Sequence, residues 1–316
     1  MIRPIAAVVA LAALVSPVAV AAAPPDADPE GVVVSELVVQ AKTVGPAWWR
    51  VSNGASTVWV MGAPSGLPKG VKWNDALLAA RLTGARRLIV PPAYGMGLGD
   101  IFGAIALRGK LKSRASIETS LPADLRARYL ADSALLRQRP ERYDHWKPAV
   151  AGLIMLGDFR KHAGIEDNQP LAAARGLAGH KGVRVTPAAA YKAMPVLKAL
   201  AGELNDAVDL ACLADSLQEI EVGPGRVQIA AQAWASGDVR GALTAERGFE
   251  RCLASFPEFT AQVRQAMADE AAAIGRDLQT PGVSVAVIPL RSLVAKDGVL
   301  SQLAARGYTV RTPASD

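Results

Sequence analysis

Three histidines are the first candidates for chemistry in this 316-residue chain, because a neutral imidazole can serve as a metal ligand or as a general base. They are His145, His162 and His180, and successive ones lie 17 and 18 residues apart. Compact metal motifs place two histidines about one helical turn apart, which is a far closer spacing. We therefore expect these histidines on the surface or at helix ends.

A glycine-rich segment from Gly95 to Asp100 follows one predicted strand and precedes an apolar helix, and Glu118 lies further along the chain. Dinucleotide-binding loops have a similar setting. The glycines at 95, 97 and 99 do not match G-x-G-x-x-G, however, and no Gly-Lys-Ser/Thr follows as in a P-loop. We expect a flexible loop that is free to act as a lid over a cleft.

Ser65 and Ser292 would each need a neighbouring base to act as a nucleophile. Ser65 lies in Gly-Ala-Pro-Ser-Gly, which is not the G-x-S-x-G elbow, and no histidine or aspartate pattern supports either serine. Nucleophilic catalysis is therefore not predicted.

Cys212 and Cys252 are the two cysteines of the chain, and each lies in a helix-like segment. They can form a disulfide that closes a loop of about 40 residues, or they can be two buried thiols. An even count of cysteines in an oxidising compartment favours the disulfide.

The N-terminus has the three parts of a secretory signal in the right order. Arg3 gives a basic start, an apolar run extends from Ile5 to Val15, and the small-x-small pattern Ala19-Val20-Ala21 follows Pro17. A membrane anchor is the weaker alternative, because a span needs about 20 apolar residues and Pro17 interrupts the run. We predict a signal peptide over residues 1–21 and a periplasmic or secreted protein.

The composition predicts a protein with a substantial core and a basic surface. Hydrophobic residues make up 51% of the chain, and the net charge is +6. The basic residues are spread out, as is typical of solvated helix faces. Outside the cytoplasm the candidate partners are an envelope protein, a peptide or an anionic polysaccharide, and not nucleic acid. The sequence contains no second long apolar run, so we expect no transmembrane segment in the mature chain.

Residues 22–45 are predicted to be a flexible leader, and residues 46–316 a single domain with strands at both ends and helices between them. The expected strands and helices are Trp49–Ser52, Thr57–Met61, Asp75–Leu82 (helix), Arg87–Val90, Val283–Pro289, Gly298–Ala305 (helix) and Tyr308–Val310. Asn53-Gly54 predicts a hairpin turn between the first two strands. The two ends share one order of elements, so we predict an α/β fold. Its mixed central sheet is built from the N- and C-terminal halves, and a large, mostly helical middle covers it.

Several segments together resemble the TraB/GumN family, which includes the TIKI metalloproteases. The hairpin Trp49 to Gly62 is similar to the opening W-x-V-S-D-G-x-S-x-[VL]-Y-L-[LF]-G of that family. Further similarities are Ala163 to Glu166 with A-G-I-D, Ala233 to Asp238 with W-x-x-G-D, Glu246-Arg247 with E-R-N, and Asp297 to Val310 with the C-terminal motif D-G-[VL]-x-x-x-L-x-x-x-G-Y-x-V. The resemblance covers most of the mature chain and implies a mixed sheet of two related halves flanked by helices.

The resemblance also implies a metal site made from two G-x-x-H motifs and acidic residues, in which the metal activates a water molecule and a carboxylate accepts the proton. This chain departs from the pattern at each of these positions. Ser65, three residues after Gly62, occupies the position of the first motif histidine. Ser292 occupies the position of the second motif histidine. Pro91 replaces a glutamate at the end of a strand. A second acidic position falls near Pro187, and Gly248 stands where an asparagine follows Arg247.

Because these losses are correlated, we infer that the metal site is gone: no catalytic residue, metal or other cofactor is predicted. Gly62, Ser65, Pro91, Arg247 and Ser292 are vestigial motif positions. The predicted function is a non-catalytic binding or scaffold protein of the cell envelope. The alternatives are a metal-dependent or rearranged hydrolase of the same fold and, without support from clustered ligands, a haem- or iron-binding protein.

Overall fold

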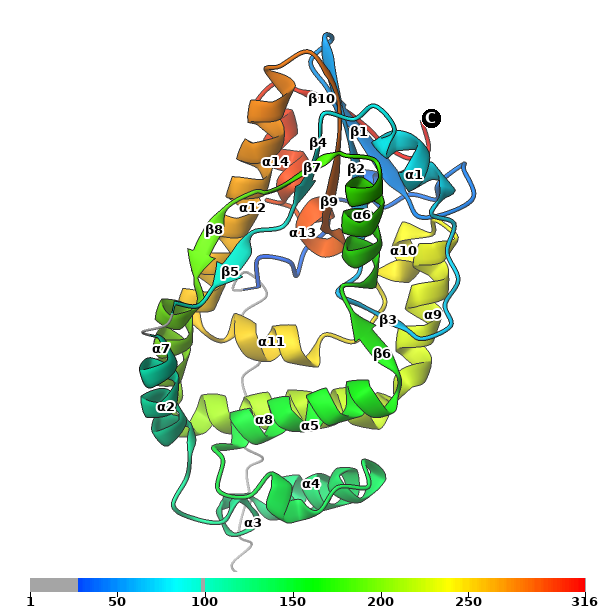
Figure 1. The fold of residues 1–316 in the computed structure, drawn as a ribbon. Helices are drawn as coiled ribbons and strands as arrows, with labels where there is room; N and C mark the ends of the chain where they lie inside the picture. The colour runs from blue at the N-terminus through cyan, green and yellow to red at the C-terminus, as the bar shows by residue number, and fades with distance from the viewer. Residues whose placement is uncertain (1–27, 98–99, 316) are drawn as a thin grey trace, which may run out of the picture.

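The computed structural model describes residues 28–97 and 100–315 (Figure 1). The predicted signal peptide at 1–21 and the first six residues of the leader lie outside the described residues. Within the described part of the chain, no helix is long and apolar enough to cross a membrane.

A six-stranded mixed sheet forms the upper half of the molecule in Figure 1, with the strand order β10-β1-β2-β9-β4-β7. Its strands are β1 (Trp48–Ser52), β2 (Ser56–Ala63), β4 (Arg87–Val90), β7 (Arg184–Pro187), β9 (Gly282–Pro289) and β10 (Thr309–Arg311). β1 is antiparallel to β2 and to β10, whereas β2, β9, β4 and β7 run parallel to one another. The predicted α/β class and the construction of the sheet from both ends of the chain are confirmed.

The hairpin between β1 and β2 forms where the sequence predicts it. Gly54 has a φ of +92°, a conformation that glycine adopts without steric cost. Asn53 fixes the turn from both sides: its side-chain oxygen accepts a hydrogen bond from the backbone of Ser56 (3.0 Å), and its side-chain nitrogen donates to the carbonyl of Leu278 (2.7 Å). The turn is thereby tied to the end of the helix that covers the sheet.

Helices cover both faces of the sheet, because β2, β9 and β4 are almost continuously apolar and need burial on both sides. α1 (Ala76–Leu82) and α6 (Gln169–His180) pack on one face, and α12 (Pro257–Leu278) and α14 (Val299–Ala305) pack on the other. The short α13 (Leu290–Val294) follows β9 directly.

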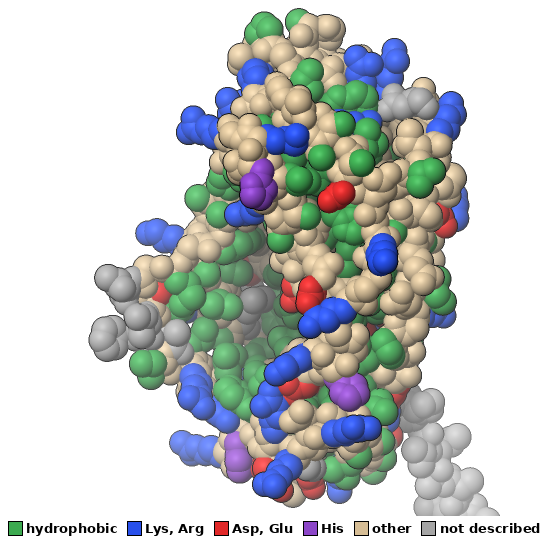
Figure 2. Space-filling model, turned by 45° about the vertical axis from the view of Figure 1, so that its right-hand side comes forward, with side chains coloured by type: hydrophobic (Ala, Val, Ile, Leu, Met, Phe, Trp, Pro, Cys, Tyr) green, Lys and Arg blue, Asp and Glu red, His purple; other side chains and the backbone are tan. Residues whose placement is uncertain are grey.

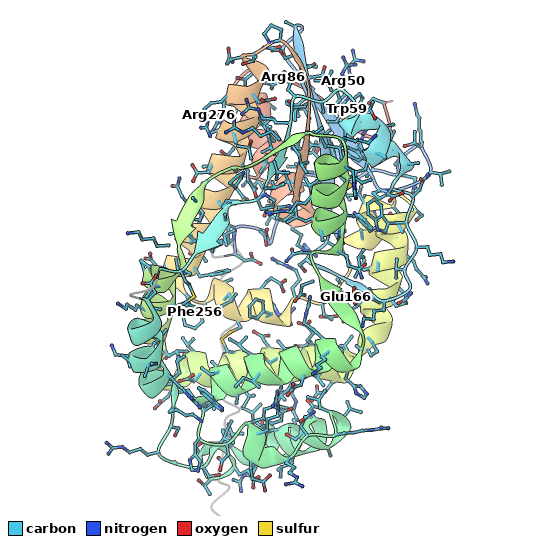
Figure 3. The ribbon with its side chains drawn as sticks, viewed as in Figure 1. Arg50, Trp59, Arg86, Glu166, Phe256 and Arg276 are labelled. Carbon is cyan, nitrogen blue, oxygen red and sulfur yellow. A yellow bond between two sulfur atoms is a disulfide. The ribbon has the colours of Figure 1, made fainter. Side chains whose placement is uncertain are left out.

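The remaining helices are α2 (Asp100–Leu111), α3 (Ile117–Ser120), α4 (Ala123–Leu135), α5 (Pro148–His162), α7 (Ala193–Glu203), α8 (Asp206–Val222), α9 (Pro224–Ala235), α10 (Val239–Ala242) and α11 (Gly248–Ala254). Of these, α9 and α10 contribute to the core of the sheet, whereas α3, α4, α5 and α8 form a helical layer beyond one edge of the sheet, with its own hydrophobic core around Tyr129, Met155 and Leu213. In Figure 3, Phe256 and Glu166 lie toward this helical layer, whereas Arg50 and Trp59 lie on the sheet. The mostly helical middle is confirmed, and much of it extends below the sheet rather than lying flat on it.

Two small strand pairs connect the layers. β3 (Gly66–Pro68) is antiparallel to β6 (Ile165–Asp167), and β5 (Ala93–Gly95) is parallel to β8 (Ala190–Lys192). Between the sheet and the lower helices the surface is hollowed, and hydrophobic side chains line that hollow (Figure 2).

The part of the leader that the structure describes is bonded to the body of the fold, which differs from the flexible leader expected over 22–45. The Val34 amide donates to the Val294 carbonyl (2.9 Å), the Lys296 amide to the Val32 carbonyl (2.8 Å), and the Ala41 amide to the Gly237 carbonyl (2.9 Å). A short 3-10 helix, η1 (Ser35–Leu37), lies between these contacts. Since every partner is more than 190 residues away in sequence, local composition could not reveal this docking.

Candidate functional site

Four parallel strands end at the same edge of the sheet, next to the helical layer. Ala63 at the end of β2 pairs with Pro289 at the end of β9, and Val90 of β4 pairs with Pro187 of β7. In open α/β sheets, ligands bind in the crevice outside the carboxyl ends of parallel strands. The loops that follow these strands are therefore the place to look for a site.

Gly62 lies in β2 directly before this edge, closely surrounded by the side chains of Leu290, Leu293 and Trp49. A Cβ there would be 2.5 Å from Cδ1 of Leu290 in α13. The Gly62 carbonyl accepts a hydrogen bond from the indole Nε1 of Trp234 (2.7 Å), which is buried and packs against Trp73 with ring centroids 5.3 Å apart. Gly62 and the tryptophan of the W-x-x-G-D segment are thus a structural pair that fixes α9 against the end of β2.

Gly237 and Asp238 complete this segment by turning the chain from α9 into α10. Gly237 has a φ of +80°, and a Cβ there would lie 2.7 Å from that of Ala41 in the leader. The Asp238 side chain caps α10 by accepting from the Gly241 amide (2.9 Å). The turn leads into residues 242–250, which form one wall of the site.

A cavity of about 450 Å³ lies beside the end of β2. Ser65 borders it, and the carbonyl of Ser65 accepts a hydrogen bond from the Asn168 amide (2.9 Å). The apolar part of the wall comes mainly from α5, α9 and α11, namely Leu153, Leu156, Val227, Ala230, Ala231 and Phe249. The volume falls in the range of small-molecule sites, about 300–1,000 Å³.

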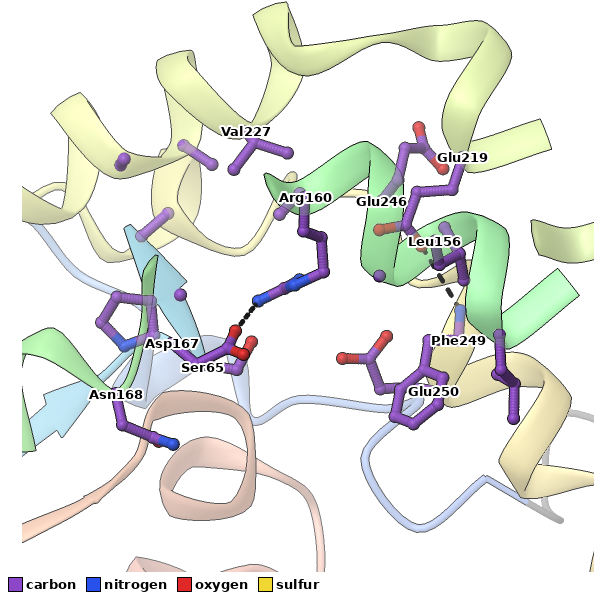
Figure 4. A pocket seen from close by; sticks show the side chains of 18 residues that line it. Ser65, Leu156, Arg160, Asp167, Asn168, Glu219, Val227, Glu246, Phe249 and Glu250 are labelled. Atoms are coloured by element: carbon purple, nitrogen blue, oxygen red, sulfur yellow. Dashed lines mark hydrogen bonds and ion pairs between the residues drawn. The ribbon is translucent and has the colours of Figure 1, made fainter. Parts of the chain in front are cut away.

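Charged side chains enter the cavity from opposite sides (Figure 4). Arg160 of α5 pairs with Asp167 at the end of β6, so these two charges compensate each other. Glu246 and Glu250 face them from the other side, together with Glu219 of α8. The cavity therefore has an excess of carboxylates, although the chain as a whole is basic.

The three glutamate carboxylates differ in the hydrogen bonds and ion pairs that they form. Glu219 accepts a hydrogen bond from the Phe249 amide (3.3 Å); burial and the nearby Glu250 raise its pKa. Glu246 lies 3.9 Å from both Arg226 and Arg251. Glu250 accepts no hydrogen bond and forms no ion pair with any other residue that the structure describes. Glu250 is thus the carboxylate most available to a ligand.

Arg247 and Ser292 meet at a different place, on the side of the leader. The Ser292 hydroxyl donates to the Glu30 carboxyl group (2.5 Å), and Arg247 pairs with Glu30 (3.4 Å) and Asp28 (2.5 Å). Burial raises the pKa of Glu30, while Ser292 and Arg247 act to lower it. Of the vestigial positions, the structure thus joins Arg247 to Ser292 through Glu30, while Ser65 lies on the separate cavity wall.

The remaining sequence candidates lie apart from both places. Pro91 follows β4 at the carboxyl edge of the sheet, half-buried. His162 and His180 are the exposed last residues of α5 and α6, and His145 is exposed beside Asp144, which agrees with the expected positions. The glycine-rich segment leaves β5 and enters α2, where Asp100 accepts from the Gly97 amide (2.7 Å); residues 98 and 99 lie outside the described part.

The sulfur atoms of Cys212 and Cys252 lie at disulfide distance, 2.09 Å apart, and connect α8 to α11. Gly248 begins α11, which packs against α8. A Cβ at this position would collide with the Asp215 carbonyl and lie 3.0 Å from a carboxyl oxygen of Glu219. The asparagine of the related motif therefore does not fit here, because the two helices pack directly against each other.

Sequence reasoning missed one further carboxyl group, that of Glu270 in α12. The residue is 2% exposed, and one of its oxygens has no hydrogen-bonding partner among the described residues. Burial raises its pKa to about 8, with smaller contributions from Glu30 and Asp269. The sequence does contain a signal for its burial, because Glu270 lies at helical spacing from Met267, Ala271 and Ile274 on the buried face of α12.

The chain thus combines a six-stranded mixed sheet that contains the β1–β2 hairpin with a W-x-x-G-D turn between α9 and α10 and an E-R segment before α11. Residues 47–312 match the TraB/PrgY/gumN family, and the chain is a member of that family. No curated protein and no solved structure shows significant similarity to it.

The metal that the resemblance implies does not fit the residues present. Ser65 and Pro91 offer no strong ligand, Ser292 is bonded to Glu30, and Arg247 and Arg291 place positive charge beside it. Within residues 28–97 and 100–315, no three histidine, cysteine, aspartate or glutamate side chains are grouped so that they could hold a metal ion.

Proposed function

We propose that this chain is an exported protein of the cell envelope that keeps the family fold, lacks the metal-dependent peptidase site and works by binding a ligand. The observation that carries the proposal is what the residues at the former metal-motif positions now contact. Ser292 and Arg247 hold a carboxyl group of the chain itself, and Ser65 borders a cavity whose described carboxylates are not grouped so that they could hold a metal ion. The N-terminal signal pattern supports the proposed location.

The cavity favours a ligand with a cationic head and an aliphatic stem. Arg160 and Asp167 offset each other, which leaves the glutamates to attract a positive charge. Glu250 has no partner of its own among the described residues, so a ligand cation would give it one. The apolar wall of Leu153, Leu156 and Val227 suits a chain of methylene groups. A lysine or arginine side chain of a peptide combines both features.

A pair of isosteric probes tests this proposal. N-acetyl-arginine amide is expected to bind in the millimolar range or tighter, whereas N-acetyl-citrulline amide, which has the same shape and no charge, binds at least tenfold more weakly. Glu250→Gln is expected to weaken binding of the arginine probe by about tenfold, since one charge-assisted contact of about 1.4 kcal/mol is lost. Chemical-shift titration of the mature protein measures both affinities.

Glu141→Gln is the matched control, because it removes the same charge from an exposed residue that does not line the cavity. It should leave the affinity unchanged. Equal affinity for the two probes, or an unchanged affinity in Glu250→Gln, would show that the glutamates do not select the ligand.

A further inference from the structure

Residues 28–34 lie against the body of the protein in the manner of a bound peptide. The Val34 amide donates to the Val294 carbonyl (2.9 Å), and the Val32 carbonyl accepts from the Lys296 amide (2.8 Å), so Val33 and Ala295 form an antiparallel bridge. Recognition of extended peptides commonly uses this pattern of backbone pairing along an exposed edge. In Figure 1 this segment, coloured blue, passes beside α13.

Two acidic side chains anchor the same segment at its beginning. Asp28 and Glu30 both pair with Arg247, whose side chain is 12% exposed. Glu30 also accepts the hydrogen bond of the buried Ser292. Charge-assisted hydrogen bonds of this kind are about twice as strong as neutral ones, so the anchor selects carboxylates.

The segment does not use all of the donors that the site offers. The buried Nε of Arg247 has no hydrogen-bonding partner among the described residues. Arg291, adjacent to Ser292, places a second guanidinium near Glu30, and its side chain donates a hydrogen bond to the Leu243 carbonyl. The site thus has more cationic capacity than its present occupant satisfies.

We propose that Arg247, Ser292 and residues 294–296 form a binding site for extended acidic peptides, and that residues 28–34 are its intramolecular occupant. The acidic residues of the peptide bind Arg247 and Ser292, and the three residues that follow the intervening glycine pair with residues 294–296. Its residues do not line the cavity, and it goes beyond the function proposed above. Because the occupant is tethered, its effective concentration is in the millimolar range, so an external peptide binds well only when the leader is weakened.

The test uses the full mature chain and a labelled synthetic peptide of residues 28–36, Asp-Pro-Glu-Gly-Val-Val-Val-Ser-Glu. In the variant D28N/E30Q, the leader loses both carboxylates and the site is unchanged. The peptide is expected to bind this variant at least tenfold more tightly than it binds the wild-type chain. A peptide that carries the same two amides should bind at least tenfold more weakly to the variant. Fluorescence anisotropy measures these affinities.

Glu36→Gln is the control chain, because it removes a charge from an exposed leader residue outside the contacts described. It should behave like the wild-type chain. A circular dichroism melt of each variant confirms that it is folded.

Hydrogen exchange on the wild-type chain gives a second measurement that does not depend on any variant. A saturating excess of the peptide should expose the Val34 amide while the Lys296 amide stays protected, because the peptide replaces the leader at the same edge. If the peptide binds neither chain, or if both amides keep their protection, the leader is a fixed part of the fold and the proposal is wrong.

Discussion

Replacing Glu270 by glutamine is expected to stabilise the protein by several kcal/mol at pH 9 and by less than about 1 kcal/mol at pH 5. The carboxyl group is buried in α12 with one oxygen unpartnered, and its pKa is raised from the ordinary 4.5 to about 8, mainly by burial. A neutral glutamine resembles the protonated carboxyl group in shape and does not ionise. The variant therefore differs in stability from the wild type at every pH at which Glu270 of the unfolded chain has lost its proton.

The direction of the effect follows from proton linkage. Between pH 4.5 and pH 8 the unfolded chain has released the proton of Glu270 and the folded protein still holds it. Raising the pH in this window therefore lowers the free energy of unfolding of the wild type, and above pH 8 the loss is complete. Since each pKa unit corresponds to about 1.4 kcal/mol, the full cost amounts to several kcal/mol.

Urea unfolding of both chains at pH 5, 7 and 9 measures the difference. Glu258→Gln is the control, because Glu258 is an exposed residue of the same helix. Its stability should follow that of the wild type within about 0.5 kcal/mol at every pH. A constant difference between Glu270→Gln and the wild type from pH 5 to pH 9 would mean that Glu270 ionises normally in the folded protein.

Loss of the Cys212–Cys252 bond is expected to lower the free energy of unfolding by about 4 kcal/mol. The two residues are 40 positions apart, and closing a loop of this length removes about that much conformational free energy from the unfolded chain. The bond also connects α8 to α11, which carries Phe249 and Glu250 into the cavity. The double variant C212A/C252A should therefore lose part of its affinity for the arginine probe.

Reduction of the wild type provides the matched comparison. The chain has two cysteines, so a reducing agent acts on this bond alone. Dithiothreitol should shift the urea midpoint of the wild type and leave that of C212A/C252A unchanged. An unchanged wild-type midpoint, with both thiols shown by alkylation to be free, would contradict a stabilising disulfide.

The sheet was predictable because its signals are local. Asn53-Gly54 predicts the hairpin turn, and the apolar runs at 87–90 and 283–289 predict strands buried on both faces. The disulfide pairing follows from the count of cysteines. The order of elements, which is the same at both ends of the chain, added what single elements could not, namely that both ends share one sheet.

The candidate site was less predictable, because its contacts join distant parts of the chain. Ser292 and Glu30 are 262 residues apart, and no local pattern marks Glu30 as a docked residue. The cavity wall combines residues from β6, α5, α8, α9 and α11, and its shape depends on how those helices pack. The sequence shows which motif positions are substituted. It does not show which residues the substituted side chains contact in the fold.

These observations give the motif positions new structural roles. Gly62 fixes α9 through Trp234, Gly248 allows α11 to lie close to α8, and Arg247 and Ser292 hold the leader. None of these roles needs a metal. The central claim is therefore that the family fold persists in this chain as a binding protein.

Metal content measured together with peptide hydrolysis tests this claim most directly. The mature protein, purified without chelators and dialysed against zinc, manganese or cobalt, is analysed by mass spectrometry for bound metal and assayed with a library of fluorogenic peptides. We predict less than about 0.1 metal ion per chain and no hydrolysis above that of the heat-denatured sample. Stoichiometric metal that is lost in Ser292→Ala, or cleavage that depends on added metal, would contradict the account.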